Sequence, residues 1–119
     1  MSLTLALLAV TATCTPGPAA KPDVETVRAF IGAINARDEV AMGRFVKADA
    51  TFAHAPGEAT MKLTDILSML VASNDHGQID IVDVTSTADG IAVRTKTGDR
   101  EMNSTLRLEG GCIVAMGQQ

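Results

Sequence analysis

The hydrophobic pattern of the chain changes at about residue 78, and this change limits the folds open to it. From there on, runs rich in β-branched residues alternate with short turn-forming sequences. Asp-Gly, at residues 89 and 90, readily adopts the positive φ of a tight hairpin. Such spacing predicts successive antiparallel strands, expected over residues 78–86, 90–97, 102–108 and 112–116. The chain therefore ends in a β-meander.

The preceding part of the chain carries helical periodicity. Apolar residues recur at spacings of three and four from Val24 to Ile34, which predicts an amphipathic helix that Asp23 caps. A second helix is expected from residue 38 to residues 47–49, with Val40 turned inward. A strand is expected over residues 50–54, and a third helix from residues 64–65. Helices first and a meander last predict the α+β class.

The N-terminal residues differ in composition from the rest. Residues 3–13 are uncharged and mostly apolar, and this run matches the core of a signal peptide but is too short to span a bilayer. Three of the four prolines follow within residues 14–22, so this stretch is expected to be an extended tether. We therefore divide the chain into a leader and tether (1–22) and one folded domain (23–119), and expect a periplasmic or secreted location.

The two cysteines lie in different contexts. A small-residue run ending in Cys14 resembles a bacterial lipoprotein signal, in which Cys14 would be lipidated and would give the only membrane contact. The positive n-region and the usual residues before the cysteine are absent, so a cleaved signal peptide or a retained N-terminal helix are alternatives. Cys112 lies in an apolar run, where a thiol behaves as a small hydrophobe. The pair is weak evidence for a disulfide and has no metal-ligand spacing.

The composition excludes some chemistry. Hydrophobic residues make up 46% of the chain, but with no Trp and no Tyr the core must be aliphatic, and there is no phenol to act as an acid. The net charge is −4 and the basic residues are scattered, which argues against a nucleic-acid surface. No cofactor-binding motif is present, and we expect neither a cofactor nor a metal.

Three segments carry a resemblance to a known superfamily. Residues 27–38 resemble the first helix of SnoaL-like (polyketide-cyclase-type) members of the nuclear-transport-factor-2-like (NTF2-like), or cystatin-like, superfamily, and residues 45–52 continue it. Residues 106–114 are similar to its closing hairpin. The resemblance implies a curved sheet wrapped round a helix, an apolar pocket at the wide end of this cone, and a homodimer formed through the open sheet face. Function does not follow from the fold, so it must come from the site.

His54 is the main catalytic candidate. It shares a strand face with Phe52, because side chains two residues apart point the same way, and an imidazole in a pocket could move protons near neutral pH. Asp49 could orient this imidazole or act as a base. The alternative is that His54 only donates to a loop carbonyl and that Asp49 only caps a turn.

Phe52, Asp83 and Arg94 are the ligand-binding candidates. Asp83 is expected on the strand face that carries Ile81, where it would meet a pocket or a dimer partner. Arg94 and Arg107 lie on neighbouring strands and could hold an anionic ligand, although arginines on surface strands are commoner. His76 is expected in a turn exposed to solvent.

Two functions remain open from the sequence. The first is an envelope or secreted domain that binds a small apolar ligand or a protein partner, without catalysis. The second is an isomerase or cyclase-type enzyme that uses His54 as general acid and base. The absence of Tyr speaks against the steroid-isomerase chemistry that the resemblance would allow.

Overall fold

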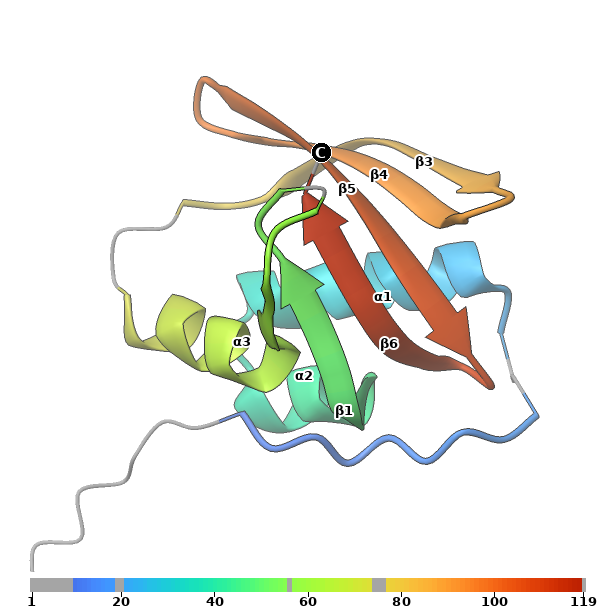
Figure 1. Ribbon diagram of the computed structural model, residues 1–119. Coiled ribbons are helices and arrows are strands. Elements are labelled where there is room, and N and C mark those ends of the chain that lie inside the picture. Colours follow the sequence, from blue (N-terminus) through green and yellow to red (C-terminus); the bar gives the residue numbers. More distant parts are fainter. Residues whose placement is uncertain (1–9, 19–20, 56, 74–76, 119) are drawn as a thin grey trace, which may run out of the picture.

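The computed structural model describes residues 10–18, 21–55, 57–73 and 77–118. Within these ranges, three helices pack against a six-stranded sheet (Figure 1). The helices are α1 (Asp23–Asn35), α2 (Glu39–Arg44) and α3 (Leu63–Ala72). The strands are β1 (Val46–Ala53), β2 (Thr60–Lys62), β3 (Asp80–Thr87), β4 (Gly90–Thr97), β5 (Arg100–Glu109) and β6 (Cys112–Gln118). The predicted α+β class is confirmed.

The sheet has the order β2-β1-β6-β5-β4-β3. Strands β3 to β6 form the predicted meander, and Gly90 has the positive φ of 136° that the β3–β4 turn requires. The sequence did not predict β2, a three-residue edge strand, or the parallel pairing of β1 with β6. A parallel pair needs a long crossover connection, which here runs through α3 and the rest of the meander.

The boundary between α2 and β1 lies earlier than the sequence pattern predicts. Asp38 caps α2, because its Oδ1 accepts a hydrogen bond from the amide of Ala41 at 3.1 Å. The helix ends at Arg44, and Val46 begins a strand in register with Ile113, where both side chains are buried. This pairing outweighs the local helical pattern. Val40, expected to point inward, is 64% exposed.

The core lies between the helices and one face of the sheet. It is aliphatic, as the composition predicts, with Phe30 and Phe45 in edge-to-face contact at 6.1 Å between ring centroids. The fully buried large side chains include members from α1, α3 and the sheet: Val27, Phe30, Leu63, Leu67, Leu106 and Ile113. Asp23 is the first residue of α1 and does not cap it, since no side-chain cap bond is made at Pro22.

Residues 10–18 pack against the domain, contrary to the expectation of a free tether. We call this segment the strap; Figure 1 shows it in blue, passing below α2 and the start of β1. Val10 is 4% exposed within the core, and its amide donates to the Ser68 hydroxyl at 2.9 Å. The amide of Thr13 donates to the carbonyl of Gly43 at 2.8 Å. The strap is extended, as the prolines predict, but part of the residues assigned to the leader belongs to the fold.

Cys14 of the strap forms a disulfide with Cys112 of β6. The sequence pattern was only weak evidence for this bond. A sulfur in a disulfide cannot also form a thioether to a lipid, so this disulfide and lipidation of Cys14 exclude each other. No helix in the described part of the chain is long and apolar enough to cross a bilayer.

Asn35, in the motif that carries the sequence resemblance, has a structural role. Its amide nitrogen donates to the carbonyl of Ile79 and its amide oxygen accepts from the amide of Ile79, both at 2.8 Å. This pair of bonds joins the end of α1 to the chain that enters β3.

We expect Asn35→Ala to lower the free energy of unfolding by about 1–3 kcal/mol, because both backbone groups of Ile79 lose their partner. Asn103→Ala, at an exposed position of β5, should change it by less than about 0.5 kcal/mol. Urea denaturation measures both variants. Equal stability of the two would contradict this role of Asn35.

Two helical glycines provide a matched test of the strap. A Cβ at Gly43 would overlap the carbonyl oxygen of Thr11, whereas a Cβ at Gly32 meets nothing within 4 Å. Gly32→Ala should stabilise the protein by roughly 0.5–1 kcal/mol through helix propensity. Gly43→Ala should instead destabilise it by about 1–3 kcal/mol, because the strap must shift. If both substitutions stabilise the protein in thermal denaturation, the strap does not lie on α2.

Candidate functional site

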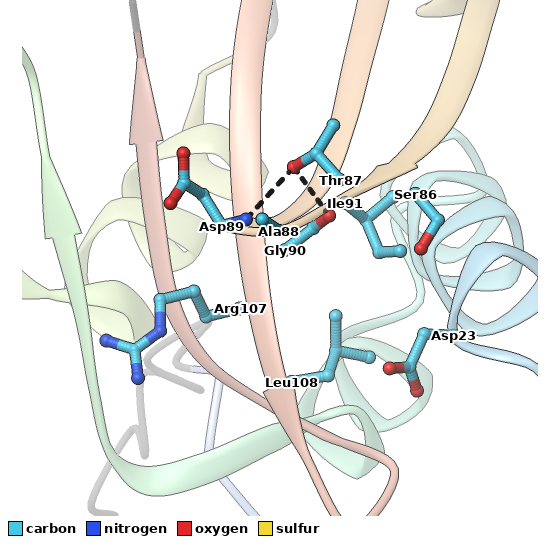
Figure 2. A pocket seen from close by; sticks show the side chains of 9 residues that line it. All are labelled: Asp23, Ser86, Thr87, Ala88, Asp89, Gly90, Ile91, Arg107 and Leu108. Atoms are coloured by element: carbon cyan, nitrogen blue, oxygen red, sulfur yellow. Dashed lines mark hydrogen bonds between the residues drawn. The ribbon is translucent and has the colours of Figure 1, made fainter.

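One surface hollow, of about 220 Å³, lies between the first turn of α1, the β3–β4 hairpin and β5 (Figure 2). The Thr87 hydroxyl in this hollow stabilises the hairpin: its Oγ1 donates to the carbonyl of Gly90 at 3.0 Å and accepts from the amide of Asp89 at 3.3 Å. Figure 2 shows Arg107 and Asp23 on opposite sides of β5. The charged groups therefore do not converge on one position where a ligand atom could react.

A second, wider hollow of about 400 Å³ lies on the sheet face that turns away from the helices, which we call the outer face. Register partners on this face are small: Thr51 lies opposite Ala115, and Ala53 and Thr105 both lie opposite Gly117. The neighbouring positions Phe52 and Met116 point to the helices instead. The hollow is thus lined largely by small side chains, together with Asp89, Arg107 and Gln118.

The structure does not bring the two catalytic candidates together. His54 follows the end of β1 and is exposed, with its ring 5.8 Å from that of Phe52, and it lines neither hollow. The Asp49 side chain is 78% exposed and its Oδ1 lies 3.6 Å from the amine of Lys47. Five residues of extended chain separate His54 from Asp49, about 16 Å. Neither group has the enclosed setting of a general acid or base.

The ligand-binding candidates also lie apart. Phe52 is 4% exposed and belongs to the core. Asp83 is on the outer face, opposite Arg94, and accepts a hydrogen bond from the Thr85 hydroxyl at 3.3 Å. A bulge between Ile81 and Asp83 reverses the predicted alternation, so Val84 points inward and Asp83 outward.

The two arginines do not form one anion site. Arg94 Nε lies 3.3 Å from Glu101 Oε1. Its register partner on β5 is Asn103, four residues from Arg107, so the two arginines start about 13 Å apart along the sheet. His76 lies outside the residues that the structure describes.

Polar chemistry inside the domain is sparse. Among residues 10–18, 21–55, 57–73 and 77–118, the buried polar residues are Thr26 and Ser104, and the Thr26 hydroxyl donates to the carbonyl of Pro22 at 3.4 Å. Within the same ranges, no three His, Cys, Asp or Glu side chains gather as metal ligands. The interior of the described part of the chain is therefore almost entirely apolar.

Comparison with protein-family models gives no match, and no curated protein matches the chain. Solved structures do match. A cystatin-fold protein from Novosphingobium aromaticivorans is 18% identical, with a TM-score of 0.68 over 84% of this chain and 99% of that one. IdmH, a candidate polyketide cyclase from Streptomyces antibioticus, is 16% identical, with a TM-score of 0.66 over 83% and 91%.

A further match is a hypothetical protein with a ketosteroid isomerase-like fold from Catenulispora acidiphila, solved with trimethylamine. It is 21% identical, with a TM-score of 0.62 over 80% of this chain and 84% of that one. The fold of this chain is therefore the NTF2-like α+β cone, as the resemblance in its sequence predicts. At these identities the likeness establishes the fold and leaves the activity to be argued from the site.

The feature that sequence reasoning missed is the disulfide and the strap it holds. The sequence did contain one signal for the disulfide. Cys14 and Cys112 are the only two cysteines of a chain whose N-terminal residues resemble an export signal. In an oxidising compartment such a pair favours a disulfide.

Proposed function

We propose that this chain is a non-catalytic binding domain of the periplasm or of the secreted space, and that it associates with a second copy through its outer sheet face. The observation that carries the proposal is the separation of the titratable candidates from any enclosed cavity. His54 and Asp49 are exposed and far apart, while the space between α1 and the sheet is filled by apolar side chains.

The outer face has the properties of a surface that another sheet can cover. A sheet with helices on one face leaves the other open. Here the open face carries Ala53, Ala115 and Gly117 side by side, so that a partner's backbone can approach closely. Contact through such a face suits a symmetric pair, in which the same surface meets itself.

Charges at the two edges of the outer face complement each other in such a pair. Lys62 lies on the β2 edge, while Asp80 and Asp83 lie on the β3 edge. A two-fold axis parallel to the strands places the β2 edge of one copy against the β3 edge of the other. Lys62 of each copy then lies near the β3 edge of the other, where Asp80 and Asp83 have Lys96 and Arg94 as register partners.

The disulfide supports the proposed location. Stable disulfides form outside the cytoplasm in most organisms, since cytosolic thiol systems keep cysteines reduced. The uncharged run at residues 3–13 is consistent with export. Attachment to a membrane through Cys14 is not part of the proposal, because its sulfur is bonded to Cys112.

The enzyme alternative would need a different site from the one that the sequence indicated. One of the structural matches is a candidate polyketide cyclase, so an enzyme is compatible with this fold. In this chain, however, His54 lines neither hollow and has no carboxylate beside it among the interactions of the described residues. A small apolar ligand would have to displace side chains such as Phe30 and Leu106, which are buried in the core.

Association is tested by placing a charge at the centre of the outer face. We expect sedimentation velocity and native mass spectrometry to show a wild-type dimer, and Ala115→Arg to weaken it by at least about tenfold, since a buried arginine there would lack a partner. Ala36→Arg, at an exposed position after α1, is the matched control and should leave the dimer intact.

A wild-type monomer at micromolar concentrations, or a dimer insensitive to Ala115→Arg, would contradict the proposal. The same native mass spectra report whether a small apolar molecule stays bound to the monomer. Such a molecule would favour the ligand-binding alternative.

A further inference from the structure

The strap contacts elements from widely separated parts of the chain. Its amides donate to Ser68 of α3, Gly43 of α2 and Val46 of β1, and that of Gly17 donates to Gly110 in the β5–β6 turn at 3.1 Å. Gly110 has a φ of 54°, and a Cβ there would lie 2.6 Å from the amide nitrogen of Gly17. The strap therefore makes hydrogen bonds to the domain from Val10 to Gly17, and Cys14 is its covalent point of attachment.

The two sulfur-bearing residues differ in their access to solvent. Cys14 is half-buried, between Thr13 and Thr15, which are both exposed. Cys112 is 0% exposed, beside the fully buried Ile113. Thiol–disulfide exchange requires a thiolate to attack one sulfur and expel the other. Of these two residues, Cys14 has surface open to a reagent in solution and Cys112 has none.

We infer that this disulfide is a redox latch on the strap, which a small-molecule thiol opens by attacking Cys14. The attacking thiolate forms a new S–S bond to the Cys14 sulfur, and the Cys14–Cys112 bond breaks. The bonding electrons leave with the Cys112 sulfur, which takes up a proton from solvent. The product is a mixed disulfide on the strap and a thiol in the core.

A second molecule of the thiol completes the reduction. It attacks the mixed disulfide and releases a small-molecule disulfide together with the Cys14 thiol. Two small thiols are then oxidised and one protein disulfide is reduced. Alternatively, the Cys112 thiolate attacks Cys14, expels the small thiol and closes the latch again. Cys14 is thus the site of thiol modification, and Cys112 is the resolving thiol.

Opening the latch has a structural consequence. The group bound to Cys14 occupies the place next to Cys112 that the strap needs in order to close. The strap is then held only by the buried Val10 side chain and by the hydrogen bonds of its amides. Where the bonds from Thr13 and Cys14 break, the carbonyls of Gly43 and Val46 become open to another extended segment. The disulfide lies at the start of β6, and its opening does not depend on association through the outer sheet face.

The site of attack is tested on the oxidised full chain with reduced glutathione as the probe. After quenching with acid and peptide mapping, we expect the glutathione adduct on the peptide that contains Cys14. Cys112 should become alkylated only after the protein is unfolded. Adduct on Cys112, an equal division between the two cysteines, or an intact disulfide after prolonged treatment would each overturn the inference.

Movement of the strap is tested by hydrogen exchange and by two matched pairs of variants. Modification should raise amide exchange in residues 13–17 by at least about tenfold and leave α1 unchanged. Val10→Ser removes the apolar anchor and should speed the reaction with glutathione severalfold, whereas Val40→Ser, at an exposed valine, should not.

Gly43→Ala lifts the strap without changing any residue of the strap, and should speed the reaction in the same way relative to Gly32→Ala. This second pair keeps the test valid if Val10→Ser does not fold. Unchanged exchange in the strap, or equal rates within the pairs that fold, would show that the strap does not move with the latch.

Discussion

The disulfide between Cys14 and Cys112 closes the chain on itself across 98 residues. In the chain-entropy model, a cross-link over a loop of this length lowers the conformational entropy of the unfolded state. This raises the free energy of that state by about 4–5 kcal/mol. The position of the disulfide matters as much as the length of the loop it closes, because β6 lies between β1 and β5 in the middle of the sheet. The strap is therefore anchored to one of the most buried parts of the domain, and its path across α2 and β1 follows from that anchor.

The alternation of side chains along the strands then determines which residues meet solvent. Phe52, Leu106 and Ile113 point to the helices and are buried, while Thr51, Thr105 and Ala115 point away. The inner face has almost no polar groups, whereas the outer face carries charged side chains such as Arg94 and Arg107 beside its small ones.

Local patterns predicted the parts of the fold that local interactions determine. The stripe from Val24 to Ile34 identified α1, and the Asp-Gly turn identified the β3–β4 hairpin. The end of α2 could not be predicted, because Val46 joins the sheet through its pairing with Ile113, far away in sequence.

The candidate site was harder to predict for the same reason. One bulge in β3 turned Asp83 to the outer face, and a bulge leaves no reliable mark in the sequence. His54 and Phe52 share a strand face, as expected, but the end of β1 places one in solvent and the other in the core. The pairing of Cys14 with Cys112 depends on the path of the whole chain between them.

The most direct test of this account is a count of free thiols in the chain purified from an oxidising compartment and unfolded in guanidinium chloride without reductant. If the strap is covalently joined to β6, no thiol should react before reduction and both cysteines should react after it, with the mass of a monomer throughout. Two reactive thiols before reduction would contradict the account, because the strap would then lack the bond that holds it to the domain.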